Sequence, residues 1–335
     1  MTRRILITGG AGFIGSNFVL QYARRYPDHR LTVVDKLTYA GRRENLSSLE
    51  SRPGFRFIQG DLCDREMVLE LVTSEDYDVI LHMAAESHVD RSIEGPRAFI
   101  ETNIIGTSNL LDGIRAAGWE NSPDRHRFIH VSTDEVYGSL GPEGSFTEES
   151  PFKPNSPYSA SKASADLLVR AAHRTYGLPT ISTHCSNNFG PFQNGEKLIP
   201  VIIRNARDST SIPVYGQGLN VRDWIYVLDH CDALEKIIEQ GNPGCSYNIG
   251  ANNEWPNLEI VKTICQIFDA KSPANAPHDR LIEFVTDRPG HDFRYAIDST
   301  RMEEECGWKA KREFAAALEE TVQWYLDHPE YLEKN

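Results

Sequence analysis

The sequence predicts an α/β fold with a doubly wound parallel sheet and a smaller α/β lobe at the C-terminal end. Strand-like and helix-like segments alternate from the start, at 4–8, about 12–25 and 31–35. Such alternation favours a parallel sheet with right-handed crossovers. The chain has 335 residues, 40% of them hydrophobic and 25% charged, which is enough apolar material for a large core.

Later segments continue the alternation. Strands are expected at 55–58, 78–82 and 127–132, and helices at about 64–74, 97–117, 158–176, 197–207, 229–240, 257–268 and 311–328. From about residue 180 the chain has more Pro, Asn and Gly and shorter elements. We therefore expect a larger domain over residues 1–180, to which some later segments return, and a smaller lobe over 181–335. The strand-like run 180–185 fits either part.

Composition argues against several classes of function. The net charge of −13 disfavours non-specific binding to nucleic acid, because neutralising phosphates requires a basic surface. No stretch approaches the roughly 20 apolar residues that cross a bilayer, and the N-terminus shows no secretory signal. We therefore expect a cytoplasmic protein without a membrane partner. The six cysteines form no Cys-x-x-Cys pair or ligand cluster, so we expect reduced core thiols and no metal site.

A glycine-rich loop follows the first predicted strand. Gly10-x-Gly12-x-x-Gly15, also readable from Gly9, opens the first predicted helix. A tight turn there needs residues without a Cβ, and the helix N-terminus offers N–H groups and a positive dipole end to a pyrophosphate. Asp35, 20 residues after Gly15, argues against a mere tight turn. These features predict a Rossmann-type dinucleotide-binding domain.

The residue that ends the second strand selects the dinucleotide. The Asp35 carboxylate can accept hydrogen bonds from the adenosine ribose and repels a 2′-phosphate, which favours NAD over NADP. Lys36, Arg42 and Arg43 leave some tolerance for NADP, because basic side chains nearby can neutralise that phosphate. Asp61 follows another strand and either reaches the adenine amine or serves as an ordinary turn residue.

Tyr158 and Lys162 stand at i and i+4 of a predicted helix, so both side chains leave the same helix face. An ammonium beside a phenol favours the phenolate, which can take a proton from a hydroxyl while hydride leaves the same carbon. In isolation such a pair is common by chance and is better explained as part of a helix surface. Downstream of a dinucleotide loop, it predicts acid–base chemistry coupled to hydride transfer.

The segment 132–135, Ser-Thr-Asp-Glu, has two interpretations. Ser132 and Glu135 have the spacing of a helix-capping box. At the carboxyl end of a central parallel strand, the same residues face the crevice where such folds bind ligands. Neighbouring acid and base groups there would permit proton transfers that simple alcohol oxidation does not need.

Several motifs in this order resemble the extended short-chain dehydrogenases/reductases, and within them the dTDP-glucose 4,6-dehydratase family. They lie at 8–15 (TGGAGFIG), 84–92, 132–138 (STDEVYG), 158–162 (YSASK), 185–188, 196–200, 222–224 and 287–291. The resemblance covers nearly the whole chain. It leaves open whether the nucleotide is thymidine or uridine.

The resemblance implies a three-step internal redox cycle on glucose. Tyr158, assisted by Thr133 and Lys162, would deprotonate the hydroxyl at carbon 4 as hydride passes to NAD. Glu135 would then remove the proton at carbon 5, while Asp134 protonates the carbon 6 hydroxyl so that water leaves. Hydride would return to carbon 6. No cofactor is consumed, so NAD is expected to stay tightly bound.

The resemblance also implies the binding residues. For NAD they are Gly9, Gly12, Phe13, Ile14, Gly15, Asp35, Lys36, Leu37, Thr38, Asp61, Leu62, Met83, Ala84, Ala85, Glu86, Thr102, Tyr158, Lys162 and Asn188. For the nucleotide sugar they are Ser87, Thr133, Asn187, Lys197, Leu198, Pro213, Val214, Tyr215, Arg222, Asn257, Asp287, Arg288, Pro289, Gly290 and His291. Lys197 and Arg222 would supply cations for the diphosphate. As alternatives, Arg222 pairs with Asp223 and Lys197 is a solvated helix residue.

Other functions remain open at this point. A UDP-glucose 4,6-dehydratase would share every motif. A sugar-nucleotide 4-epimerase would have no use for the extra pair Asp134 and Glu135. A decarboxylase acting on UDP-glucuronate would need a cationic pocket, and an NAD-binding sensor would be expected to lack Tyr158 or Lys162. We also expect a homodimer, formed by the helices at 97–117 and 158–176 as the resemblance implies, and a place in deoxysugar biosynthesis.

Overall fold

A seven-stranded parallel sheet forms the centre of the larger part of the protein. The computed structural model describes residues 2–333. The strands are β1 (Arg4–Thr8), β2 (Arg30–Asp35), β3 (Phe55–Gln59), β4 (Val79–His82), β5 (Arg127–Thr133), β6 (Thr180–Cys185) and β10 (Ser246–Ile249), in the order β10-β6-β5-β4-β1-β2-β3. The order reverses between β1 and β4, so the predicted doubly wound α/β fold is confirmed.

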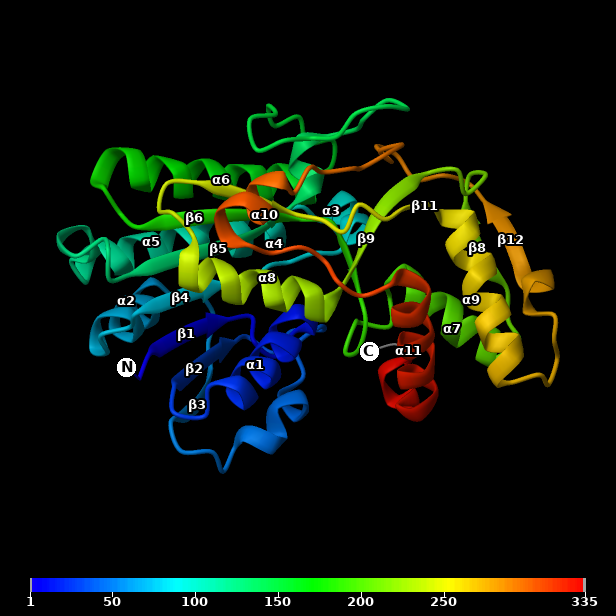
Figure 1. Ribbon diagram of the computed structural model, residues 1–335, viewed down its shortest axis with the longest axis horizontal. Helices are drawn as coiled ribbons and strands as arrows, with labels where there is room; N and C mark the ends of the chain where they lie inside the picture. The colour runs from blue at the N-terminus through cyan, green and yellow to red at the C-terminus, as the bar shows by residue number, and fades with distance from the viewer. Residues whose placement is uncertain (1, 334–335) are drawn as a thin grey trace.

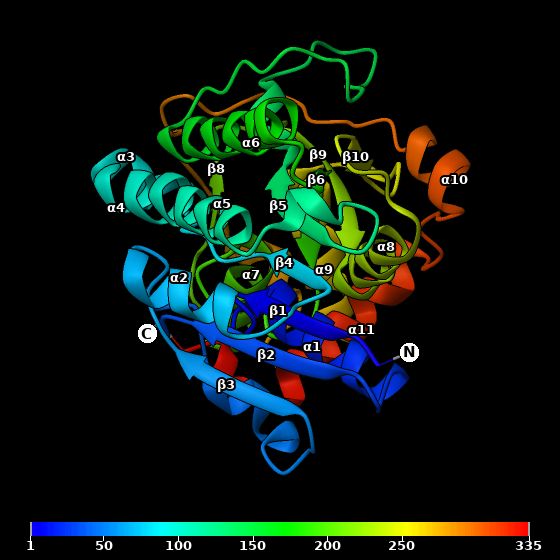
Figure 2. The same ribbon diagram turned by 90° about the vertical axis from the view of Figure 1, so that its left-hand side faces the viewer.

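Helices cover both faces of this sheet (Figure 2). One face carries α1 (Phe13–Arg25), α8 (Val227–Gln240) and α10 (Thr300–Cys306), and the other α2 (Arg65–Ser74), α5 (Gly106–Ala116) and α6 (Pro157–Tyr176). Successive side chains of a strand point to opposite faces. Thus Ile5 and Ile7 of β1 pack in the core under α1 and α8, whereas Leu6 packs in the core under α2 and α5.

The helix expected at 97–117 is divided into segments with different hydrogen bonding. After α3 (Val89–Glu94) come α4 (Arg97–Phe99), the π-helical segment η2 (Ile100–Ile105) and then α5. In η2, the side chain of buried Asn103 accepts from Glu86 N at 2.9 Å and donates to Ser161 Oγ at 2.8 Å. The wider π turn therefore occurs where Asn103 holds the loop after β4 by hydrogen bonds. Such π turns are frequent at functional sites.

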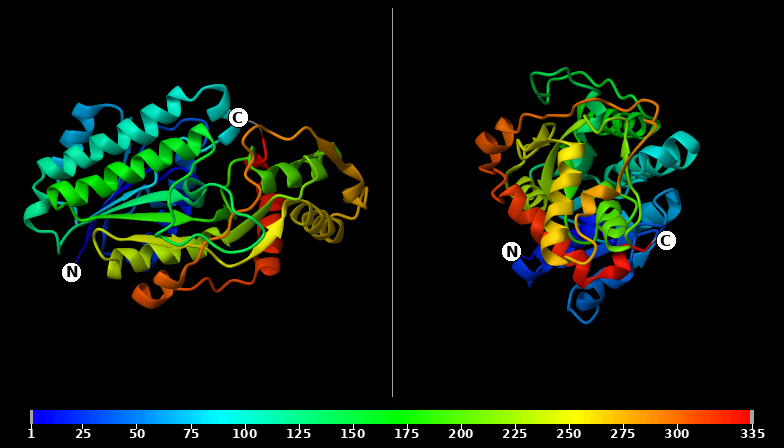
Figure 3. Two further views of the ribbon diagram at one scale, coloured as in Figure 1. Left: turned by 90° about the horizontal axis from the view of Figure 1, so that it is seen from above. Right: turned by 90° about the vertical axis from the view of Figure 1, so that its right-hand side faces the viewer.

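A smaller lobe lies beyond the carboxyl edge of the sheet, at the right-hand end of Figure 1 and facing the viewer in the right panel of Figure 3. It contains the three-stranded sheet β7 (Asn187–Phe189), β9 (Val221–Tyr226) and β11 (Glu254–Pro256), and the pair β8 (Ile212–Tyr215) and β12 (Ile282–Val285). Around them lie α7 (Leu198–Arg207), α9 (Asn257–Lys271) and α11 (Phe314–Asp327). Ile202, Ile264 and Leu318 belong to the common core of these helices.

The chain crosses between the two parts more than once. It enters the lobe at β7, after β6, and returns to the larger part at α8 and β10, with α8 against α1. The division at residue 180 stays a prediction. Short 3-10 helices occur at η1 (Arg43–Leu49), η3 (Trp119–Asn121), η4 (Asp134–Tyr137), η5 (His278–Leu281) and η6 (Pro329–Tyr331). Within residues 2–333, no helix has the length and apolar character needed to span a bilayer.

Candidate active site

A cavity of about 300 Å³ opens at the carboxyl edge of the large sheet, where the segments following β1, β4, β5 and β6 converge. Folds of this kind bind ligands at the point where the strand order reverses. All five residues predicted to be catalytic line this cavity: Thr133, Asp134, Glu135, Tyr158 and Lys162. The structure therefore brings the predicted chemistry into one place.

Most residues predicted to bind the dinucleotide line the same cavity. They are Gly9, Gly12, Phe13, Ile14, Gly15, Asp35, Lys36, Thr38, Met83, Ala84, Ala85, Glu86, Thr102 and Asn188, besides Tyr158 and Lys162. Leu37, Asp61 and Leu62 lie outside the lining. Leu62 packs in the core under α2 and α5. Asp61 accepts from Cys63 N at 2.9 Å and pairs with Lys36 at 2.7 Å, and its contact with the adenine amine stays a prediction.

The glycine loop leaves room that side chains would fill. Gly9 has φ +70°, and a Cβ there would lie 2.6 Å from the Cα of Ala84. A Cβ on Gly15 would overlap the carbonyl oxygen of Gly9. Gly12 precedes the first turn of α1, and no side chain caps that turn. The exposed N–H groups and the positive end of the helix dipole thus face the cavity, as a pyrophosphate requires.

The carboxylate of Asp35 holds the end of β2 against this loop. It accepts hydrogen bonds from Ala11 N at 2.9 Å and from Leu37 N at 2.8 Å. Burial raises the pKa of Asp35, and these two hydrogen bonds lower it. The basic side chains that would help a 2′-phosphate are engaged elsewhere, since Arg42 donates to Glu330 O at 3.1 Å and Arg43 to Glu50 at 3.1 Å. This arrangement fits NAD better than NADP.

Thr133, Asp134 and Glu135 stand where β5 ends and η4 begins. Thr133 caps this turn, because its Oγ1 accepts from Glu135 N and donates to Asp134 Oδ1, both at 3.3 Å. The capping box proposed for Ser132 is absent, since Ser132 Oγ donates instead to Asp166 Oδ2 at 2.6 Å. Asp134 is 1% exposed, and its Oδ2 has no hydrogen-bond partner among residues 2–333.

The surroundings of Asp134 and Glu135 shift the pKa values of the two carboxyl groups by different amounts. Burial raises the pKa of Asp134 well above its usual range, and the neighbouring charge of Glu135 adds to the shift. Burial also raises the pKa of Glu135, but three cations oppose it, in decreasing order Arg288, Arg222 and Lys197. The pKa of Asp134 is therefore raised further than that of Glu135, so Asp134 holds its proton more tightly than its neighbour does.

Tyr158 and Lys162 leave one face of α6 as expected, but their electrostatics differ from the prediction. Burial, followed by the charge of Glu135, raises the pKa of Tyr158 well above its usual value, and a hydrogen bond with Thr133 lowers it. The Lys162 ammonium is directed at the backbone of β5, where Nζ donates to Val131 O at 2.8 Å. The expected lowering of the Tyr158 pKa by a neighbouring ammonium is therefore not found in the chain alone, where desolvation raises that pKa.

Lys197 and Arg222 are both placed near the acid–base pair. Lys197 lines the cavity and donates to Ser87 O at 2.8 Å, so it is not a solvated helix residue. Arg222 is 5% exposed, donates to Asp292 O at 2.9 Å and lies over the ring of Tyr295. The alternative ion pair with Asp223 does not form, because that carboxylate accepts backbone N–H groups at 2.7 and 3.1 Å.

Only four of the residues predicted to bind the sugar nucleotide line the cavity. Ser87, Thr133, Asn187 and Lys197 line it, whereas Leu198, Pro213, Val214, Tyr215, Arg222, Asn257, Asp287, Arg288, Pro289, Gly290 and His291 do not. Several of the latter contact one another or the segment after β4. His291 Nδ1 contacts Asp287 at 2.6 Å and its ring meets that of Tyr215, while Arg288 pairs with Asp90 at 3.3 Å.

Sequence reasoning missed a group of polar side chains at one side of the cavity. Glu196 lines it and pairs with Arg91 at 3.2 Å and with His88 at 3.7 Å. The guanidinium of Arg91 also lies 3.8 Å from the ring centre of Tyr39. Glu196 belongs to the motif 196–200, which was the available signal. Arg91 and His88 lie in the motif 84–92, whereas Tyr39 lies in none of the motifs, and only the fold brings these segments together.

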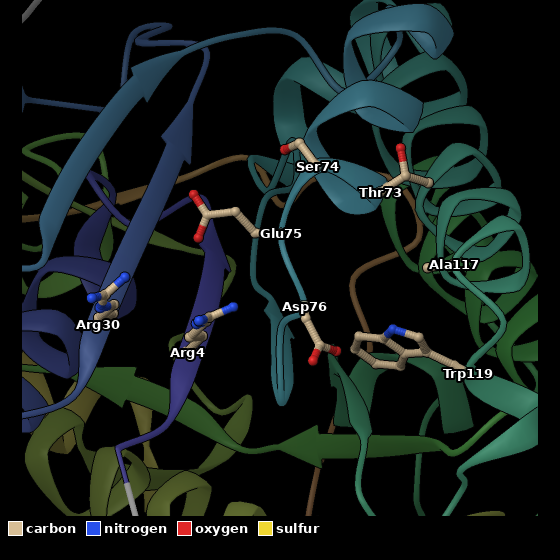
Figure 4. Close-up of a pocket in the computed structure, with 8 residues that line it drawn as sticks. All are labelled: Arg4, Arg30, Thr73, Ser74, Glu75, Asp76, Ala117 and Trp119. Carbon is tan, nitrogen blue, oxygen red and sulfur yellow. The ribbon is translucent and has the colours of Figure 1, made fainter.

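A second cavity, of about 530 Å³, lies at the opposite end of the large sheet (Figure 4). Glu75, which precedes β4, points toward Arg4 and Arg30 at the start of β1 and β2, whereas Asp76 points toward Trp119. No residue predicted to be catalytic or to bind a ligand lines it. It lies at the amino ends of the strands, away from the edge where such sheets carry out chemistry.

Comparison with known proteins gives a consistent picture. The family model described as GDP-mannose 4,6 dehydratase matches residues 6–321. The dTDP-glucose 4,6-dehydratase of Xanthomonas campestris pv. campestris (strain B100) is 49% identical over 98% of this chain and 94% of that protein. The dTDP-glucose 4,6-dehydratase of Neisseria meningitidis serogroup B is 50% identical over 97% of this chain and 94% of that protein.

Solved structures agree with these relatives. A dTDP-glucose 4,6-dehydratase from Streptomyces venezuelae, solved with NAD and dTDP bound, superposes with a TM-score of 0.90 at 45% identity, covering 98% of this chain and 99% of that one. A UDP-glucose 4-epimerase from Thermotoga maritima superposes with a TM-score of 0.86, at 26% identity over 97% of this chain and 99% of that one. The fold is thus shared with epimerases, whereas the sequence is much closer to dehydratases.

Proposed function

Because this chain belongs to the dTDP-glucose 4,6-dehydratase family, we propose that it converts dTDP-glucose to dTDP-4-keto-6-deoxyglucose and water. The observation that carries the proposal is the acid–base pair Asp134 and Glu135, which shares one cavity with Tyr158, Lys162 and the glycine loop. Oxidation of the carbon 4 hydroxyl alone would need only Tyr158 and Lys162. The additional pair supplies the two proton transfers of an elimination.

The cofactor of this family is NAD, and the residues present fit it. Gly9, Gly12 and Gly15 leave space for a pyrophosphate at the start of α1, and Asp35 would receive the adenosine ribose. When bound, NAD supplies a hydride acceptor at the first step and a hydride donor at the last. Because no cofactor is consumed, tight retention of NAD is part of the proposal.

In the first step, the chain must hold the carbon 4 hydroxyl against a base. We assign that role to Tyr158, which shares a hydrogen bond with Thr133. The pKa of Tyr158 is raised in the chain alone, so proton removal needs a positive charge beside the phenol. The oxidised nicotinamide would supply such a charge, so Tyr158 would take the proton from the oxygen of the carbon 4 hydroxyl as hydride leaves carbon 4. Lys162 adds a second cation on the same helix face.

In the second step, water leaves across carbons 5 and 6. Glu135, ionised under the influence of Arg288 and two further cations, would remove the carbon 5 proton that the new ketone has made acidic. Asp134, kept protonated by burial, would donate its proton to the departing hydroxyl. Its unpartnered Oδ2 is the atom available for this transfer. The two roles follow from surroundings that differ in positive charge.

The experiment is an incubation of the purified protein with dTDP-glucose and, separately, with UDP-glucose. Mass spectrometry should detect loss of one water, faster with dTDP-glucose. Glu135→Gln should abolish the loss, because the amide cannot accept the proton. Glu143→Gln, an exposed glutamate, is the matched control and should be as active as wild type. An unchanged mass with galactose configuration would make the protein an epimerase, and no turnover would support a sensor.

We also propose that the protein is a cytoplasmic homodimer. Apolar side chains are exposed along η2 and α6, which lie side by side on the outside of the molecule (Figure 3). Ile100 is 50% exposed, Ile105 46%, Leu167 55% and Leu168 37%. Exposed apolar side chains on neighbouring helices are typical of a contact between subunits. Its pairing with a second copy would bury all four side chains.

A further inference from the structure

A buried polar group lies between α6 and the large sheet. It contains Asp166, His130, Ser132, His184 and Lys162, and we call it the Asp166 cluster. Each member is at most 3% exposed. Asp166 comes one helical turn after Lys162, and the other three residues come from β5 and β6, which lie against α6 (Figure 2). Buried charges without partners are costly, so the contacts within this group are informative.

Asp166 is held through one of its two carboxylate oxygens. Ser132 Oγ donates to Oδ2 at 2.6 Å, and His184 Nε2 lies 3.5 Å from the same oxygen. Oδ1 faces His130 Nε2 at 3.7 Å and has no hydrogen-bond partner among residues 2–333. One oxygen is thus used to fix the carboxylate in place, and the other is directed toward His130.

His130 stands between Asp166 and Lys162. Its Nε2 lies 3.5 Å from Lys162 Nζ and 3.7 Å from Asp166 Oδ1. Burial, and then the charge of Lys162, lowers the pKa of His130 well below its usual range, so the imidazole is neutral. The Nζ atom of Lys162 therefore lies near the neutral ring of His130 and the carbonyl of Val131, and the carboxylate of Asp166 lies on the other side of that ring.

The groups that face Lys162 from the neighbouring elements carry little charge. His82 on β4 is neutral, because burial lowers its pKa to about 3. Cys185 on β6 is a thiol, because burial raises its pKa to about 12. Tyr158 is un-ionised in the chain alone. Burial lowers the pKa of Lys162 to about 8, and Asp166 is the largest influence that raises it. His184 contacts Asp166, not Lys162.

We propose that Asp166 is a positioning residue for catalysis: through the electrostatic field that it exerts across His130, it keeps Lys162 protonated beside Tyr158. This inference rests on the proposed function, since it concerns the tyrosine and lysine of that reaction. Asp166 touches neither substrate nor cofactor. It acts on the charge state of Lys162, which does line the cavity. Its effect should therefore appear as a change in the pH dependence of kcat.

The test is the pH dependence of kcat for the NAD-loaded full-length protein with saturating dTDP-glucose. Asp166→Asn removes the charge but keeps an oxygen that accepts from Ser132. Because Asp166 raises the pKa of Lys162, its loss should move the alkaline limb of the pH profile of kcat to lower pH. Above pH ~8, activity should fall about tenfold for each pH unit by which the limb moves. Activity near pH ~6.5 should change much less. The matched control is His184→Gln, which alters the other side of Asp166 and should leave the limb in place.

Each outcome decides the question. A shifted alkaline limb in Asp166→Asn, with the His184→Gln limb unmoved, supports the proposal. An equal loss at every pH, or an unmoved limb, overturns it and leaves Asp166 a structural residue. If Asp166→Asn does not fold, Asp166→Ser takes its place, and failure of both to fold also overturns the proposal. Lack of turnover by the wild-type protein would refute the proposed function itself, which distinguishes the two failures.

Discussion

Replacing Gly9 by alanine tests whether the glycine loop is built around close backbone contact. Gly9 has φ +70°, and its Cβ would lie 2.6 Å from both the Cα and the N of Ala84. Ordinary contact begins near 3.4 Å, so one of the two backbones must move by about 0.8 Å. Both segments line the cavity, and the movement would therefore narrow or distort the proposed pyrophosphate site.

The magnitude follows from two contributions. An L-residue in the left-handed region costs about 1–2 kcal/mol. Movement of the backbone also weakens the hydrogen bonds from Gly9 N to Val34 O at 2.8 Å and from Met83 N to Thr8 O at 3.1 Å. Each is worth about 1 kcal/mol. We therefore expect Gly9→Ala to lower the free energy of unfolding by about 3 kcal/mol and to abolish NAD retention.

Gly177 provides the matched control. Its φ is +72°, but a Cβ there would meet nothing within 4 Å. Gly177→Ala should therefore show only the backbone strain, about 1–2 kcal/mol, and keep its NAD. Urea unfolding and the NAD content of the purified proteins measure both effects. Equal destabilisation of the two variants, or full NAD content in Gly9→Ala, would refute the reasoning.

Three further predictions concern charge and association. Arg288→Gln removes the largest cationic influence on Glu135, so the pKa of that carboxyl should rise further and the acidic limb of kcat should move to higher pH; an unmoved limb would contradict this. Leu167→Glu should give a monomer by light scattering, whereas Leu219→Glu, at an equally exposed leucine outside the helical surface, should not. Asp229→Asn removes a buried partner of Arg312 at 2.6 Å and should lower the free energy of unfolding by about 2 kcal/mol in urea. The same change at an exposed aspartate should cost less than about 0.5 kcal/mol.

The sequence was sufficient for the features that depend on local pattern. Alternating strands and helices gave the doubly wound sheet, and the elements of the structure begin and end within a few residues of the expected positions. The glycine loop, Asp35 and the pair Tyr158 and Lys162 could be recognised because their spacing along one strand, turn or helix already determines which side chains face the same way. Strand β10 and most strands of the lobe were not expected from the sequence. The π turn η2, which divides an expected helix, depends on the non-local contacts of Asn103.

Only the tertiary structure decided the electrostatics. Asp134 and Glu135 are neighbours in sequence, yet Arg288, Arg222 and Lys197, which favour ionisation of Glu135, come from three distant segments. The Asp166 cluster likewise joins one helix to two strands, and burial reversed the expected effect on Tyr158. Sequence spacing determines orientation along an element, whereas desolvation and long-range charge depend on what the fold packs around each group.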